Sequence, residues 1–231
     1  MGAASAGGGF FLTFEGVEGS GKSTQQALLA RRLRGAGHVV LEVREPGGTP
    51  LGESLRPLLL HTQGAAPAPP AELFLYLASR AQLAAQVIGP ALAGGQLVLC
   101  DRFVDSTAAY QGYGRGMDLE LIARLNRLAT AGVWPDLTVL LDLDPAAGLA
   151  RLAGRAGTAA AAGGGTDGLD RFEREALAFH RCVREGYLAL ARAEPGRFLV
   201  MDAAQDAGAI AASLWPQVEA RLRRAAPAPA P

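Results

Sequence analysis

The sequence has little of what disulfide-stabilised, metal-binding or membrane-spanning proteins contain. Its two cysteines, Cys100 and Cys182, form no C-x-x-C pair, which is typical of a reduced intracellular protein. The three histidines are scattered along the chain, so no metal cluster is predicted from them. No apolar run approaches 18 residues, and Met1–Gly9 lacks the basic start of a signal peptide. These absences predict a cytoplasmic protein with no membrane partner.

An excess of charge of one sign is also missing. Lysine plus arginine and aspartate plus glutamate both number 22, so the formal net charge is zero, which argues against a nucleic-acid partner. The 231 residues suit a single domain. Because we find no internal repeat, we expect a flexible tail over 1–9, one domain over 10–224 and a disordered Ala/Pro tail over 225–231.

What the sequence does contain is a glycine-rich phosphate-binding motif. The apolar run 10–14 is followed by G-x-x-x-x-G-K-[ST], with Gly16, Gly21, Lys22 and Ser23 at the fixed positions. A helical pattern begins directly afterwards, and strand, glycine turn and helix are the context that this motif needs. The pattern predicts a loop whose backbone N–H groups wrap a phosphate chain at a helix N-terminus.

The remaining elements predict the architecture around this loop. Apolar strands are expected over 10–14, 38–43, 96–100, 136–142 and 197–202. Helical patterns separate them, among them one from 145 to about 154 and one over 169–192, and 106–112 is expected as a loop. This alternation predicts an α/β fold, a five-stranded parallel sheet with helices on both faces. Ligands of such sheets bind at the carboxyl ends of the strands. The phosphate loop, Arg44-Glu45 and Asp101-Arg102 fall at three of these ends, so we expect one common site.

Several motifs narrow the prediction beyond nucleotide binding. Phe14–Thr24, Arg44–Thr49, Asp101-Arg102 and Ser106–Gly112 together resemble the motifs of bacterial thymidylate kinases, and Leu169–Glu173 is similar to the segment after their lid. The resemblance covers roughly 10 to 224, in order and at the family's spacings. It implies a P-loop kinase fold with a mobile lid over about 151–171, transfer of the γ-phosphoryl of ATP to dTMP, a Mg²⁺ requirement and a homodimer.

On the ATP side, the loop and the resemblance assign roles to residues of the phosphate loop, the start of the helix after it and the end of the lid. Lys22 is expected to reach the β- and γ-phosphates, and the Ser23 hydroxyl to hold Mg²⁺, with Asp101 acting through water. The resemblance adds Arg171 as an ATP contact after the lid. The expected ATP-binding residues are Gly16, Glu18, Gly19, Ser20, Gly21, Lys22, Ser23, Thr24 and Arg171.

On the acceptor side, the roles come from the resemblance. It implies that Arg102 binds the acceptor phosphate, with added charge from Arg44 and Arg56, and that Glu18 holds the 3′-hydroxyl. It further implies that Tyr110 excludes a ribose 2′-hydroxyl. The remaining acceptor residues are Phe74, stacked on thymine, Arg80, bonded to the base, Ser106, and Gln111, near the base.

For several of these residues a purely structural alternative stays open. Asp101-Arg102 would serve equally as an ion pair at a strand end, and Glu18 as a solvent-facing loop residue. Arg56 alone is more often a solvated helix residue. Phe74 or Tyr110 would serve as core packing.

In the family that this sequence resembles, positive charge comes either from a basic residue within the phosphate loop or from basic residues in the lid. Since the loop positions before Lys22 contain no basic residue, the resemblance implies that the lid supplies this charge. Arg151 and Arg155 lie four apart and share a helix face, so either is a candidate for the role of an arginine finger. The sequence departs from the family pattern by extra Ala and Gly between Arg155 and Asp170. Whether Arg151, Arg155 or Arg171 reaches ATP therefore stays open.

Two rival functions remain at this point. A deoxynucleoside kinase would need a carboxylate base near the 5′-hydroxyl and less positive charge than Arg44, Arg56 and Arg102 provide. A nucleotide-driven switch of the GTPase type would need an N/T-K-x-D motif, and we find none.

Overall fold

The computed structural model describes residues 8–61, 66–161 and 170–225, with the side chains of 155–161 left out of the description. Most of the two expected tails, 1–7 and 226–231, and the lid segment 162–169 lie outside the described residues. Within the described ranges, no helix combines the length and the apolar character needed to cross a bilayer.

A five-stranded parallel sheet forms the centre of the molecule, as predicted. Its strands stand in the order β2-β3-β1-β4-β5. Their bounds are β1 Phe10–Glu15, β2 Val40–Arg44, β3 Leu97–Asp101, β4 Leu137–Asp142 and β5 Phe198–Asp202. Strand β1 lies between β3 and β4 in the middle of the sheet. The loop after β1 therefore stands at the carboxyl end of the central strand, where parallel α/β folds bind their ligands.

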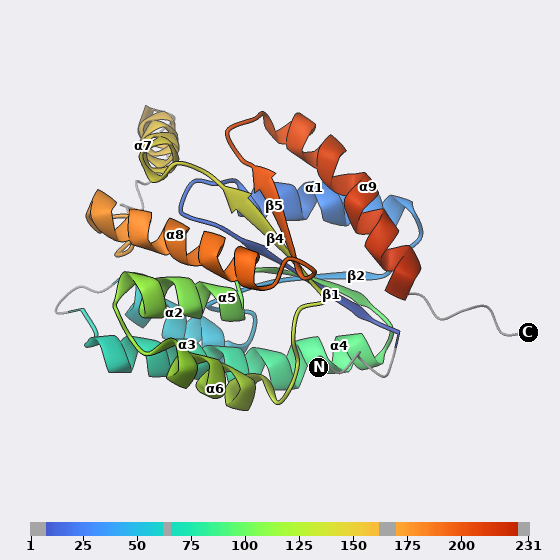
Figure 1. Ribbon diagram of the computed structural model, residues 1–231, viewed down its shortest axis with the longest axis horizontal. Helices are drawn as coiled ribbons and strands as arrows, with labels where there is room; N and C mark the ends of the chain where they lie inside the picture. The colour runs from blue at the N-terminus through green and yellow to red at the C-terminus, as the bar shows by residue number, and fades with distance from the viewer. Residues whose placement is uncertain (1–7, 62–65, 162–169, 226–231) are drawn as a thin grey trace, which may run out of the picture.

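Helices cover both faces of this sheet (Figure 1). Helix α1 (Lys22–Gly35) and α9 (Ala207–Ala225) lie together on one face, and α8 (Leu177–Ala193) lies on the other. The remaining helical elements are α2 Pro50–Leu60, α3 Pro69–Leu83, the π-helical η1 Ala84–Ile88, α4 Gly89–Ala93, α5 Val104–Thr107, the π-helical η2 Ala108–Gly114, α6 Leu119–Thr130 and α7 Pro145–Ala161.

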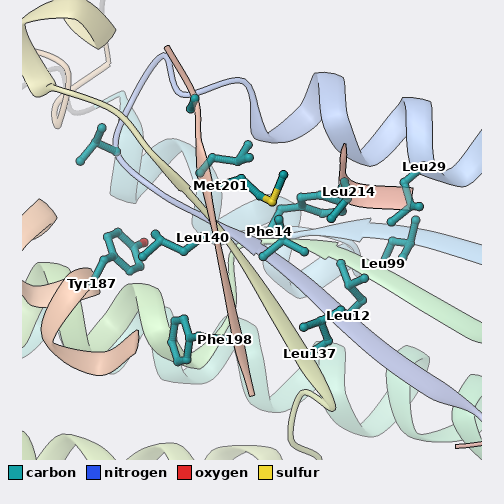
Figure 2. Packing of buried hydrophobic residues seen from close by; sticks show 14 of the residues in the cluster. Leu12, Phe14, Leu29, Leu99, Leu137, Leu140, Tyr187, Phe198, Met201 and Leu214 are labelled. Carbon is teal, nitrogen blue, oxygen red and sulfur yellow. The ribbon is translucent and has the colours of Figure 1, made fainter. Parts of the chain in front are cut away.

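Alternate residues of the central strands enter two separate cores. Leu12 and Phe14 of β1 pack with Leu29 of α1 and Leu214 of α9 (Figure 2). Phe11, between them in sequence, packs instead with η1 and α4 on the opposite face. This alternation follows from the two-residue period of a strand. Because both faces are covered, the strand carrying the phosphate loop is buried along its whole length.

Three local differences from the sequence prediction concern the surroundings of the site. The segment 106–112, expected as a loop, is helical within α5 and η2. Helix α7 does not stop near 154 but continues to Ala161, since alanine favours helix. The helix expected from 169 begins only at Leu177, because Asp170 and Glu173 each accept the other's backbone N–H, at 2.9 and 2.8 Å, and close a separate turn.

Candidate active site

The phosphate loop connects β1 to α1 and needs glycine at several positions. Gly16, Gly19 and Gly21 have φ values of 142°, 71° and 94°, a region that side-chain-bearing residues rarely adopt. Lys22 is buried, and its Nζ donates to the carbonyl oxygens of Gly16 at 3.0 Å and Val17 at 2.9 Å. Burial and the nearby Arg102 lower the pKa of Lys22 to about 8. The only lysine of the chain is therefore folded back along the loop.

The loop also packs closely against the start of α7. A Cβ atom at Gly19 would lie 2.2 Å from the carbonyl oxygen of Gly148, and one at Gly148 would lie 2.3 Å from that of Glu18. Real Cβ atoms do not approach backbone so closely. The base of the expected lid therefore rests directly on the phosphate loop.

Ser23 and Asp101 meet across the sheet edge. The Ser23 hydroxyl at the start of α1 donates to Asp101 Oδ2 at the end of β3, at 2.5 Å. These are the two residues expected from the sequence to hold Mg²⁺. Among the described residues no group of three or more His, Cys, Asp or Glu side chains is arranged for a metal ion. A hydroxyl and one carboxylate are nevertheless suitable protein ligands for Mg²⁺, because this ion usually completes its coordination with water molecules and phosphate oxygens.

Glu18 holds the most heavily bonded carboxylate of the loop. Its Oε1 accepts from Arg102 Nη2 at 3.0 Å and from the Tyr110 hydroxyl, and its Oε2 lies 3.1 Å from His180 Nδ1. Burial alone would raise its pKa, but the bond to His180 and the charges of Arg102 and Lys22 outweigh burial and hold the pKa at about 2. Glu18 is thus a fixed anion, and the solvent-facing alternative is wrong because the side chain is only 9% exposed.

Beneath Arg102 lies a second carboxylate, Glu15, at the end of β1. It accepts from the Phe103 backbone N–H at 2.8 Å, the Ser106 hydroxyl at 2.6 Å and the Tyr187 hydroxyl at 2.8 Å. Burial and the charge of Asp105 raise the pKa of Glu15 to about 7, although the hydrogen bonds from Ser106 and Tyr187 and the charge of Arg102 act in the opposite direction. Arg102 itself adopts φ 70°, a strained conformation for a residue with a side chain.

A cavity of about 240 Å³ opens in front of these groups. Its lining includes residues from β1–α1, β2–α2, β3–α5, α7 and the turn before α8, so segments far apart in the sequence contribute to it. Of the expected site residues, the structure brings eleven to this cavity: Glu18, Gly19, Lys22, Ser23, Arg44, Arg56, Asp101, Arg102, Ser106, Tyr110 and Gln111. Gly16, Ser20, Gly21 and Thr24 complete the loop and the first turn of α1 beside it.

Phe74 does not reach this cavity, and the expectation that it faces the base is wrong. Its side chain is 59% exposed on α3. Tyr76, two residues later, lines the cavity together with Phe172 and Tyr110, and the Tyr110 and Phe172 rings lie 5.4 Å apart. Residues two apart on a helix point in different directions, so the aromatic wall of the cavity uses Tyr76 instead.

Arg80 and Arg171 also differ from expectation, because both are tied to buried carboxylates. The Arg80 side chain is 1% exposed and ion-paired with Glu45 at 2.6 Å. Arg171 lies 2.6 Å from Glu72, and its Nε donates to the carbonyl oxygen of Leu59. Neither arginine lines the cavity. Both guanidinium groups are therefore engaged with protein carboxylates outside the cavity lining, which is not the placement expected for contacts with a base or with ATP.

The other expected arginines divide into two groups. Arg44 is half exposed and paired with Glu53, whereas Arg56 donates to the carbonyl oxygen of Pro46, and both border the cavity. Arg151 is exposed on α7 and donates to the carbonyl oxygen of Ala204 at 3.4 Å. Arg155 lies on α7 too, but its side chain is outside the described part of the molecule.

Sequence reasoning missed His180 and Tyr187, which bond the two loop carboxylates Glu18 and Glu15. Both lie on α8, seven residues apart, and so share one face of the helix. Val183 and Gly186 lie buried between them. Two polar residues on the buried face of an amphipathic helix are the signal that would have indicated them, since buried polar groups need partners.

Fold and site together define a P-loop nucleotide kinase, because a phosphate loop after the central strand faces a cavity that arginines also line. Comparison with known proteins narrows the class. A family model for thymidylate kinase matches residues 14–213. A thymidylate kinase from Solidesulfovibrio magneticus is 58% identical over 89% of this chain and 96% of its own length, and one from a Synechococcus strain is 54% identical over 92% and 95%. A crystal structure of thymidylate kinase from Ehrlichia chaffeensis has a TM-score of 0.70 and 34% identity, over 91% of this chain and 99% of that one. The chain belongs to the thymidylate kinase family.

Proposed function

We propose that this protein transfers the γ-phosphoryl group of ATP to dTMP and releases ADP and dTDP. A phosphate oxygen of dTMP forms the new bond to the γ-phosphorus as the bond to the ADP oxygen breaks. The observation that carries the proposal is the cavity in front of Lys22, which Arg44, Arg56 and Arg102 border. The membership in the thymidylate kinase family supports the same reaction. Such a reaction needs positioning and charge neutralisation rather than covalent catalysis.

For ATP, we propose that the loop from Gly16 to Gly21 surrounds the phosphates with backbone N–H groups at the N-terminus of α1. Lys22 then exchanges its contacts with the loop carbonyl oxygens for phosphate oxygens. Ser23 would hold Mg²⁺ directly and Asp101 through water. When bound, this ion would neutralise phosphate charge, and the 2.5 Å contact of the two side chains supports a shared role.

For dTMP, we propose that Arg102 binds the phosphate, with added charge from Arg44 and Arg56. Glu18 would accept from the 3′-hydroxyl, and Tyr110, which bonds Glu18 at the cavity wall, would occupy the space of a 2′-hydroxyl. The thymine would lie against the aromatic wall of Tyr76 and Phe172, in place of the Phe74 stacking expected from sequence.

For the lid, we propose Arg151 and Arg155 as the residues that supply charge to the phosphates on closure. Both lie on α7, whose first turns rest on the phosphate loop. Arg171 is better suited to fix the turn before α8, because it is paired with Glu72. The lid thus remains a proposed part of a single kinase domain over 10–224.

The test is an ADP-release assay over a panel of nucleoside monophosphates and nucleosides. The proposal expects ADP formation in proportion to dTMP supplied. A deoxynucleoside kinase would respond to thymidine instead, and a switch protein would hydrolyse ATP without either acceptor. Response to thymidine alone would overturn the proposal.

We further propose a homodimer. Helices α3 and α6 contact each other and expose large apolar side chains, Phe74 at 59% and Leu128 at 78%, an arrangement typical of an interface. Light scattering at micromolar concentration measures the mass directly, and a monomer would contradict this part. The zero net charge supports the absence of a nucleic-acid partner. The two cysteines, which form no C-x-x-C pair, support the proposed cytoplasmic location.

A further inference from the structure

His180 lies outside the phosphate loop, the cavity lining and the arginines, yet it contacts the loop carboxylate directly. It is in the first turn of α8, its side chain is fully buried, and its Nδ1 lies 3.1 Å from Glu18 Oε2, across 162 residues of sequence. In the described part of the protein, its other ring nitrogen, Nε2, is buried without a hydrogen-bond partner. Among the described residues the ring therefore makes one hydrogen bond, to Glu18, beside an edge contact with the ring of Phe179.

The direction of this hydrogen bond follows from the state of Glu18. An ionised carboxylate only accepts hydrogen bonds, so the proton belongs to His180 Nδ1. On the other side of the carboxylate, Oε1 accepts from Arg102 and from Tyr110. Each oxygen is thus held by a different part of the chain, Oε1 by the β3–η2 segment and Oε2 by α8.

These two attachments respond differently to substrate. Arg102 borders the cavity and is the proposed ligand of the acceptor phosphate, so its charge is shared when dTMP binds. At the same time Glu18 comes under repulsion from phosphates at the neighbouring Lys22. His180 does not line the cavity, so its bond to Oε2 is independent of the substrate. It is the attachment that persists when the other is weakened.

We propose that His180 is a positioning residue, whose Nδ1–H holds the Glu18 carboxylate at the orientation in which it receives the sugar hydroxyl of the acceptor nucleotide. This inference rests on the proposed role of Glu18 in dTMP binding. It assigns His180 no contact with substrate. Its effect is on acceptor recognition rather than on ATP.

A pair of substitutions separates this role from simple core packing. His180→Asn keeps an N–H donor close to the place of Nδ1 but fills less space, whereas His180→Phe keeps a ring and removes the donor. Loss of a hydrogen bond to a charged group corresponds to about 10-fold to 100-fold in binding. We expect His180→Phe to raise the KM for dTMP by about that factor, with kcat and the KM for ATP within about threefold. His180→Asn should stay within about threefold of the wild type. The reverse order, a normal Phe variant and an impaired Asn variant, would overturn the proposal.

Dependence on Glu18 is tested by a double substitution. In a protein that already carries Glu18→Gln, adding His180→Phe should change the KM for dTMP by less than about twofold, since the partner carboxylate is gone. Independent, multiplicative effects would show that His180 acts by another route. Melting temperatures of all variants separate misfolding from loss of positioning.

One measurement needs no variant to fold. The sequence has three histidines, His38, His61 and His180, so nitrogen-15 NMR of the ring nitrogens of the full-length wild type is readily assigned. We expect His180 to carry its proton on Nδ1, and a proton on Nε2 alone would overturn the proposal. A wild type that fails to phosphorylate dTMP would refute the proposed function instead, and it would leave this tautomer unchanged.

Discussion

Replacing Arg80 by methionine should destabilise the protein far more than an ordinary arginine substitution. All five N–H groups of the guanidinium have partners, and Glu45 and the Phe103 carbonyl oxygen are two of them. Methionine keeps the unbranched stem but leaves Glu45, with a side chain 3% exposed, without its counter-charge. Removing one partner of a buried ion pair costs about 3–5 kcal/mol. For a chain of this length that corresponds to a fall in Tm of roughly 6–20 °C.

A matched control exists on the surface of the same protein. Arg34 and Glu42 approach to the same 2.6 Å, but their side chains are 49% and 32% exposed, so Arg34→Met should cost about 0–1 kcal/mol. Urea unfolding at pH 7 measures both variants. Burial already raises the pKa of Glu45, and Arg80 counteracts that rise. Without Arg80, folding should therefore favour a protonated Glu45, and stability should recover as the pH falls.

Equal costs for Arg80→Met and Arg34→Met would refute the reasoning from the buried pair. A variant at Arg80 that kept its stability but lost affinity for dTMP would also refute it. That outcome would restore the contact with the base that the family resemblance implies.

Four further predictions concern the site itself. Lys22→Ala should lower phosphoryl transfer by at least about 10²–10³-fold in a folded protein, and normal turnover of this variant would contradict the site. Because Lys22 is the only lysine, ATP should also protect it from an amine-reactive label, which mass spectrometry detects. Tyr110→Ala should lower turnover of dTMP more than that of ribothymidine monophosphate, and an unchanged ratio would exclude a steric role. Burial and Asp105 raise the folded-state pKa of Glu15 from 4.5 to about 7, so the wild type should lose stability as the pH rises between these values. Glu15→Gln should remove that part of the pH dependence in urea unfolding. An unchanged dependence of the unfolding free energy on pH would contradict this prediction. Alanine at Arg155 or Arg151 should lower kcat by about 10³-fold for whichever acts as the finger, and losses below tenfold at both would place the charge elsewhere.

The sheet could be predicted from the sequence because its determinants are local. The apolar strand β1, the glycine pattern after it and the start of α1 are contiguous, and all three are confirmed. The helical state of 104–114 was not predicted. Its tyrosine and glycine residues have weak helix propensity, and the segment packs instead against α8 and α6.

The candidate site was predictable only where residues belong to a contiguous motif. Lys22 and Ser23 belong to the phosphate-loop motif, Asp101 and Arg102 stand at the end of β3, and all four line the cavity. The partners of Glu15 and Glu18 on α8 could not be predicted. The hydrophobic pattern of a helix indicates which of its faces is buried, but it does not indicate which distant carboxylate that face contacts. The prediction for Phe74 was wrong for a geometric reason. Two residues along a helix point in different directions, so Tyr76 lines the cavity and Phe74 does not.

The long sequence separations at the loop have a consequence for synthesis of the chain. The strand and loop at 10–21 are made first, yet β1 pairs with β3 and β4, and the carboxylates of Glu15 and Glu18 find their α8 partners 172 and 162 residues later. At ribosomal rates of about 5–20 residues per second, this interval is on the order of ten to forty seconds. During that time the nascent chain has a phosphate loop but not the contacts that fix its carboxylates. A chain arrested before α8 should therefore expose the loop to proteases, and the nucleotide site should appear late, as one of the last parts of the molecule to form.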